Sequence, residues 1–213
     1  MTVKKYILIL IAAIALPFAT KAQTFVEGGL GYIPFSVSTV SDGNVSTGMA
    51  LNLQYGKFVN NYKMRSVTFS MRSVPVLRDD VTISPPNGMG TDYKIAITSK
   101  ATTFCLGYER KVTFGYTEFD DQWQFYNIIN YYLNITSISE SYSKPGIPDN
   151  KKEAGTYFNP DIGIGLGMAR KFQQKAYGYV DLRLYGPILG EGIGGDYYDI
   201  GASLNFGVRY FLR

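Results

Sequence analysis

The chain has 213 residues, with 21 basic and 17 acidic side chains, and 15% of its residues are aromatic. It contains no histidine and a single cysteine, Cys105. The missing imidazoles exclude histidine-based catalysis and imidazole metal sites, and one cysteine excludes an intrachain disulfide or a thiolate cluster. Paired carboxylates remain open as a catalytic route. We nevertheless predict a non-enzymatic protein with no catalytic residue, cofactor or metal site, because each carboxylate has a structural interpretation.

The segment 1–22 has the order of a cleaved secretory signal peptide. Lys4 and Lys5 precede an apolar run over 6–18, and small residues follow in 19–22. That run is shorter than the roughly 20 residues that span a bilayer, although an N-terminal membrane anchor is the alternative. Cleavage would also remove Lys21 but no acidic residue, leaving 18 basic against 17 acidic side chains. This nearly neutral balance gives no support to nucleic-acid binding.

Eight segments of 23–213 alternate apolar and polar residues with a period of two, which predicts β-strands with one apolar face. In chain order they cover 26–32, 49–56, 66–72, 102–109, 123–136, 158–168, 179–185 and 199–213. The connections cover 36–47, 57–61, 74–92, 110–121, 137–156, 171–175 and 186–196. No apolar stretch after 1–22 approaches the roughly 18 residues of a transmembrane helix, so a membrane-spanning form must be a closed barrel.

The last segment, 199–213, shows the two faces most clearly. Its apolar face holds Ile200, Ala202, Leu204, Phe206, Val208, Tyr210 and Leu212. Its other face is polar or small until the final member and holds Asp199, Gly201, Ser203, Asn205, Gly207, Arg209 and Phe211. We expect the first face to contact lipid and the second to line a narrow lumen. Gly163, Gly165 and Gly167 fit the same crowded interior.

Short and long connections alternate, as in transmembrane barrels whose termini share one side. Soluble sandwiches alternate too, and a lipocalin-like barrel carries its apolar face inside around a ligand. Unbroken apolar faces opposite polar faces, with aromatic residues near segment ends, favour the membrane. We therefore predict an all-β fold, an eight-stranded antiparallel up-and-down transmembrane β-barrel. One domain, 23–213, would form it in the bacterial outer membrane.

The signal peptide, the eight alternating segments and the terminal sequence FGVRYFLR over 206–213 resemble the small outer-membrane β-barrels of Gram-negative bacteria. The relatives are of the OmpX, OmpA-barrel or PorT-like type. This resemblance implies that the barrel-assembly machinery reads the last strand. Its signal would comprise Phe206, Val208, Tyr210 and Phe211. In that family the final residue is usually aromatic, whereas here Leu212 and Arg213 follow. The resemblance carries over no catalytic residue.

Eight charged residues fall on the inward faces of the segments. They are Glu27, Arg72, Glu109, Asp161, Asp181, Arg183, Asp199 and Arg209. A lumen of eight strands has room only for side chains, and an isolated buried charge costs several kcal/mol. We therefore predict a paired charge network, with Asp181 and Arg183 sharing one face of one strand. We interpret it as a structural plug, and a gated ion path is the alternative.

Aromatic residues near segment ends predict an interfacial girdle. They are Tyr32, Tyr55, Tyr108, Trp123, Phe158 and Tyr210. A soluble core or ligand pocket is the alternative for individual members. The long connections 74–92 and 137–156 are the expected recognition sites, because loops on a rigid scaffold commonly bind partners. Their partner would be a protein or a surface polymer.

The glycines of 190–195 match the dinucleotide pattern GxGxxG in form only, since the following residues predict a strand and not a helix. We predict a structural or interaction component of the outer membrane that acts through its external loops and can dock onto a larger outer-membrane assembly. A small channel or a conduit for lipids or hydrophobes is the first alternative. A secreted soluble ligand-binding barrel is the second.

Overall fold

The structure is a computed structural model that describes residues 23–38, 45–77, 81–83, 93–114, 118–144, 147–188 and 199–212. Its strands are β1 (Thr24–Ser38), β2 (Val45–Asn60), β3 (Lys63–Leu77), β4 (Val81–Ile83), β5 (Tyr93–Thr113), β6 (Trp123–Lys144), β7 (Ile147–Gln173), β8 (Ala176–Pro187) and β9 (Asp199–Phe211). No helix among the described residues is long and apolar enough to cross a membrane. The predicted signal peptide, 1–22, lies outside the described residues.

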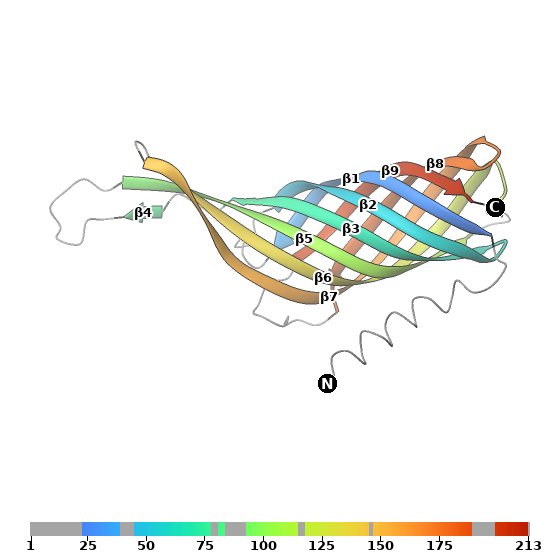
Figure 1. The fold of residues 1–213 in the computed structure, drawn as a ribbon, viewed down its shortest axis with the longest axis horizontal. Helices are drawn as coiled ribbons and strands as arrows, with labels where there is room; N and C mark the ends of the chain where they lie inside the picture. The colour runs from blue at the N-terminus through green and yellow to red at the C-terminus, as the bar shows by residue number, and fades with distance from the viewer. Residues whose placement is uncertain are drawn as a thin grey trace.

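Eight strands form a closed antiparallel barrel (Figure 1). Each strand pairs with its neighbour in the chain, and β3 pairs with β5 because the short β4 lies outside the barrel and bonds only to the start of β5. The first and last strands close the cylinder, with Phe25 opposite Phe211 and Glu27 opposite Arg209. The predicted eight-stranded up-and-down topology is confirmed.

The outer surface of the barrel is apolar. Leu51, Leu133 and Leu182 are each about half exposed, although they are large aliphatic side chains. On β7, outward side chains are apolar at every second position from Phe158 to Met168, a stretch of 11 residues. That length matches the roughly 9–11 residues of a tilted strand that crosses a bilayer. The structure thus rejects a soluble barrel that carries its apolar face inside.

The two ends of the barrel differ. At one end, which we call the turn end, β2–β3 and β7–β8 connect through Asn61–Tyr62 and Gln174–Lys175, and β1 begins and β9 ends there. At the opposite end, the hairpin end, β5, β6 and β7 continue together beyond the other strands (Figure 1). In transmembrane barrels, the short turns, the start of the first strand and the end of the last strand face the periplasm. The hairpin end therefore faces the cell exterior.

The strands extend into all seven predicted connections, and three cases bear on the site. The connection 137–156 is a β-hairpin, because β6 and β7 stay paired as far as Lys144 and Ile147. Connection 74–92 contains the end of β3 and all of β4, and connection 110–121 begins with the last residues of β5. These parts of the strands lack a long apolar face in the sequence, and alternation therefore did not mark them.

β1 also extends beyond its predicted end near Pro34. Its pairing shifts register between Ile33 and Ser36 on the β2 side. Pro34 and Phe35 are both exposed at this bulge. The bulge resets the alternation, so that Ser36 and Ser38 again face the lumen.

Candidate functional site

All eight charged side chains assigned to the inward faces are buried in the barrel. The least buried are Arg72 and Asp199, each 6% exposed. Strand alternation places them there, because every second residue of a barrel strand points inward. They divide into two clusters at different heights in the lumen, and a lysine absent from the prediction joins one of them.

The turn-end cluster contains three cations and three carboxylates. Its members are Glu27, Glu109, Lys111, Asp181, Arg183 and Arg209. Lys111 lies near its centre, with its Nζ atom 2.6 Å from Glu27, 3.4 Å from Glu109 and 3.5 Å from Asp181. Because the formal charges cancel and the groups are in contact, this cluster can remain ionised inside the barrel.

Arg183 joins two carboxylates from different strands. One of its terminal nitrogens lies 2.7 Å from Glu109, and the other lies 2.7 Å from Asp181. It also donates a 3.1 Å hydrogen bond to the hydroxyl of Tyr132. The hydroxyl of Tyr126 donates to the second oxygen of Asp181 at 2.8 Å. The lumen is therefore bridged from β8 to β5 and β6.

Arg209 and Glu27 pair across the seam between β9 and β1, where Arg209 Nε donates to the Glu27 carboxylate. A terminal nitrogen of Arg209 donates a 2.7 Å hydrogen bond to Gln124 Oε1. Since Glu27 also contacts Lys111 on β5, the seam is tied to the opposite wall of the barrel.

The hairpin-end cluster consists of Arg72, Asp161 and Asp199. Arg72 lies 3.0 Å from Asp161 and 3.8 Å from Asp199, and its guanidinium stacks 4.1 Å from the ring centre of Tyr185. A cavity of about 20 Å³ lies between the two clusters, which is room for about one water molecule. The described lumen therefore contains polar side chains at contact distance and not an open pore.

An aromatic layer closes the turn end of the lumen below the turn-end cluster. It comprises Phe25, Phe58, Phe119, Tyr177 and Phe211. Phe58 packs edge to face against Phe211 with ring centres 5.1 Å apart, and against Phe119 at 5.7 Å. The Arg209 guanidinium lies 5.7 Å from the Phe119 ring, so the charges rest directly on this layer.

Phe119 reaches the lumen from the connection between β5 and β6. Its backbone N–H donates to the carbonyl of Asn61 at 2.9 Å, and its carbonyl accepts from Gln124 at 2.6 Å. The neighbouring Glu118 accepts a 2.9 Å hydrogen bond from the hydroxyl of Tyr62. That bond favours the protonated phenol and raises the pKa of Tyr62 above its ordinary value. The connection is thus fastened to the β2–β3 turn.

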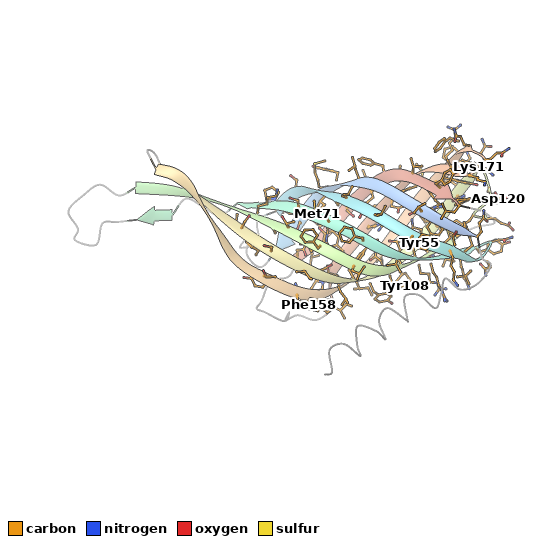
Figure 2. The ribbon with its side chains drawn as sticks, in the orientation of Figure 1. Tyr55, Met71, Tyr108, Asp120, Phe158 and Lys171 are labelled. Atoms are coloured by element: carbon orange, nitrogen blue, oxygen red, sulfur yellow. The ribbon has the colours of Figure 1, made fainter. Side chains whose placement is uncertain are left out.

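A second ion pair fastens the same end at the accessible rim of the barrel. Lys171 lies 3.1 Å from Asp120, and both are labelled at the turn end in Figure 2. The hydrogen bond to Asp120 raises the pKa of Lys171. Both side chains are more accessible than the lumen pairs, so this contact contributes less to stability.

Lys111 and Phe119 are absent from the predicted lumen residues because both fall in the predicted connection 110–121. Lys111 continues the inward series of Cys105, Gly107 and Glu109 by one further step, so extending that strand by two residues would have identified it. Ile128 likewise faces the lumen and Asn127 faces outward, because alternation on β6 is unbroken. No sequence signal marks Phe119, which is placed by a turn and not by a strand.

The predicted girdle residues all point outward, with exposed fractions from 36% for Phe158 to 47% for Tyr210. Figure 2 shows Tyr55, Tyr108 and Phe158 on the outside of the barrel. Tyr55, Tyr108, Trp123 and Tyr210 lie within five residues of strand ends at the turn end. Tyr32 and Phe158 lie farther from that end.

The residues of the proposed C-terminal signal split between the two faces of β9. Phe206, Val208 and Tyr210 are exposed on the outside, whereas Phe211 is buried in the aromatic layer.

Of the proposed partner connections, 78–80, 84–92 and 145–146 lie outside the described residues. Among the described residues, no group of three or more histidine, cysteine, aspartate or glutamate side chains could hold a metal ion.

A closed barrel with an apolar belt and a charged, filled lumen has the architecture of the small eight-stranded outer-membrane proteins. The chain therefore belongs in a bacterial outer membrane, where lipid covers the belt. The resemblance seen in the sequence is confirmed for the fold.

No protein-family model matches the sequence, and no curated protein matches it. Among solved structures, Neisserial surface protein A has a TM-score of 0.51 at 10% identity, over 88% of this chain and 96% of that chain. Ail of Yersinia pestis scores 0.45 at 13% identity, over 90% and 100%. The outer membrane protease OmpT of Escherichia coli scores 0.41 at 8% identity, over 89% and 97%. The similarity to Neisserial surface protein A concerns the fold alone.

Proposed function

We propose that the protein is a non-enzymatic outer-membrane component whose plugged barrel supports a β-sheet projection that binds a protein or surface polymer outside the cell. The projection consists of the ends of β5, β6 and β7 beyond the barrel (Figure 1). The observation that carries the proposal is the pairing of β6 and β7, with two register shifts, from Ile138 and Gly155 out to Lys144 and Ile147. A paired hairpin presents a defined surface, which favours recognition.

The projection has an available strand edge. β8 pairs with β7 only from Asp161 to Gln173, so within the described part of the chain β6 is the one strand beside 147–159. An edge of this kind presents backbone N–H and C=O groups that can bond to an added strand. We infer that a protein partner would add an extended segment along β7, a recognition mode that uses main-chain hydrogen bonds.

The filled lumen supports a structural role for the barrel itself. Ion pairs cross the lumen in two clusters, and the aromatic layer covers its turn end. A conduit for solutes or lipids would need a continuous opening through these side chains. The absence of histidine from the chain and the pairing of the lumen carboxylates with cations support a non-enzymatic role.

The experiment compares the full chain with a variant that lacks 139–154 and joins β6 to β7 through an Asn-Gly turn. Ile138 and Gly155 are register partners, so the two-residue turn closes the shortened hairpin in register. Cross-linking on intact cells should yield adducts with the full chain that are absent from the variant. Heat-dependent migration of the unboiled variant on a gel checks that its barrel is folded. Identical adducts from a folded variant would refute the proposal.

A further inference from the structure

A basic patch lies on the outside of the barrel at its turn end. It comprises Lys57 on β2, Lys63 and Arg65 on β3, and Arg110 on β5. Lys57 is directly opposite Arg65, and Arg65 is directly opposite Arg110. Three cations thus form one row across three adjacent strands, with Arg65 and Arg110 exposed.

This arrangement is unfavourable unless an anion neutralises it. Side chains directly opposite on antiparallel strands have Cβ atoms about 4.5–5.5 Å apart, and like charges at that spacing destabilise a sheet. Within the described part of the chain, no carboxylate forms an ion pair with Lys63, Arg65 or Arg110. The acidic Glu118 of this end is engaged by Tyr62 and Asn61. Among the described residues, Arg65 and Arg110 therefore have no carboxylate counterion, and an external anion can neutralise them.

The position of the patch identifies the class of anion. The next outward row toward the membrane centre is Tyr55, Val67 and Tyr108, which are register partners on the same three strands. Both arginines lie close enough to Tyr108 to interact electrostatically with its hydroxyl group. The row beyond that contains Leu53, Phe69 and Leu106, all exposed and apolar. A ligand bound here would have an anionic group at the arginines and a hydrocarbon chain along the belt.

We propose that Arg65 and Arg110 bind the phosphate of an anionic membrane phospholipid on the periplasmic side of the outer membrane. Guanidinium groups suit this ligand, because each can donate two parallel hydrogen bonds to phosphate oxygens. Lys57 and Lys63 add positive charge at the membrane surface, where each basic residue attracts anionic lipid. The acyl chains lie against Val67, Phe69 and Leu106. The site is independent of the β6–β7 projection and does not rest on the proposed partner binding.

The test measures lipid retention by the full chain. The barrel is reconstituted in nanodiscs that contain equal amounts of phosphatidylcholine and phosphatidylglycerol, released into mild detergent, and analysed by native mass spectrometry. The wild type should retain phosphatidylglycerol in preference to phosphatidylcholine. The double variant Arg65→Gln, Arg110→Gln should retain about tenfold less, since two charge-assisted contacts are lost.

Arg170→Gln is the matched control. Arg170 is also an exposed arginine near the turn end, but it lies on β7 against Trp123, with its guanidinium 5.1 Å from the ring. This variant should retain phosphatidylglycerol as the wild type does. Heat-dependent gel migration shows that each variant is folded, and all three residues are on the surface. Equal losses in both variants would overturn the assignment of the site to Arg65 and Arg110.

A further arm separates a lipid site from a simple phosphate site. Excess inorganic phosphate added after release should leave phosphatidylglycerol bound, because the acyl chains contribute to its affinity. Displacement by inorganic phosphate would overturn the lipid assignment. Equal retention of the two lipids by the wild type would overturn the requirement for an anionic headgroup.

Discussion

Lys111 contacts more carboxylates than any cation that the sequence placed in the lumen. It is 1% exposed and is the common neighbour of Glu27, Glu109 and Asp181. The ring centres of Tyr126 and Tyr179 lie 5.2 Å and 5.3 Å from its ammonium group, which adds cation–π attraction. Lys111 therefore offsets the repulsion among three carboxylates that the fold brings together.

Replacing Lys111 by methionine should destabilise the barrel strongly. The methionine fills a similar volume but leaves the turn-end cluster with three carboxylates and two cations. Breaking a buried ion pair by removing one partner costs about 3–5 kcal/mol. The urea midpoint of unfolding in detergent, followed by gel migration, should fall accordingly. Lys171→Met removes the accessible pair with Asp120 and should cost less than about 1 kcal/mol. Equal effects of the two substitutions would contradict a central role for Lys111.

Gly167 tests how closely the lumen is filled. A Cβ atom at this position would collide with Asp181 and the ring of Tyr126. Neither group can move freely, because they are hydrogen-bonded to each other. Gly167→Ala should therefore lower the free energy of unfolding by about 1–3 kcal/mol, as overpacking does. The control is Gly178→Ala, since a Cβ there has no heavy atom within 4 Å. Equal stability of the two variants would show that the lumen can expand.

At the scale of elements, alternation predicted the parts of the strands that cross the lipid belt. Along β7 it separates Ile162, Ile164 and Leu166 from the glycines that face the lumen. The extension of β6 and β7 was missed, because 137–156 lies beyond the belt and lacks that contrast. Ion pairing could be predicted only for residues inside the predicted strand limits. Lys111 lies in β5 beyond the predicted end of that strand, at 109. Phe119 lies in a turn, where no alternation of apolar and polar residues indicates which way a side chain points.

The two faces of β9 should separate stability from assembly. Phe211 is buried in the aromatic layer, with its ring 4.9 Å from Tyr177 and 5.1 Å from Phe58. Phe211→Ala should cost about 3–5 kcal/mol of stability in the purified barrel. Tyr210 points outward and is 47% exposed, so Tyr210→Ala should leave that stability nearly unchanged. If the outer face of β9 is the assembly signal, Tyr210→Ala will instead slow the appearance of the folded form in cells.

Pulse–chase labelling with unboiled gels measures that rate, and urea titration of the purified barrels measures stability. Slow assembly with normal stability for Tyr210→Ala is the expected combination. Normal assembly of this variant would remove Tyr210 from the signal. A large loss of stability in purified Tyr210→Ala would show that the contacts of Tyr210 on the outer surface stabilise the folded barrel.

At the scale of the whole molecule, three barriers lie in series along the lumen. The hairpin-end cluster is first, the turn-end cluster is second, and the aromatic layer closes the turn end. Each barrier spans the lumen with contacts between different strands, such as Arg72 with Asp161 and Arg183 with Glu109. Barriers in series must all open before ions pass. The plug is thus a property of the assembled barrel and not of one residue.

This arrangement predicts that the wild type will show no steady conductance in planar bilayers, where a general porin serves as the positive control. Arg72→Ala removes the hairpin-end cation, yet it should remain non-conducting because the turn-end cluster and the aromatic layer still close the lumen. The substitution should also lower stability, since it leaves Asp161 and Asp199 without their cation. Urea titration of the same preparation verifies that the mutation acts on a folded barrel. Steady conductance of the wild type would contradict the plug, and conductance created by Arg72→Ala alone would locate the gate at the hairpin-end cluster.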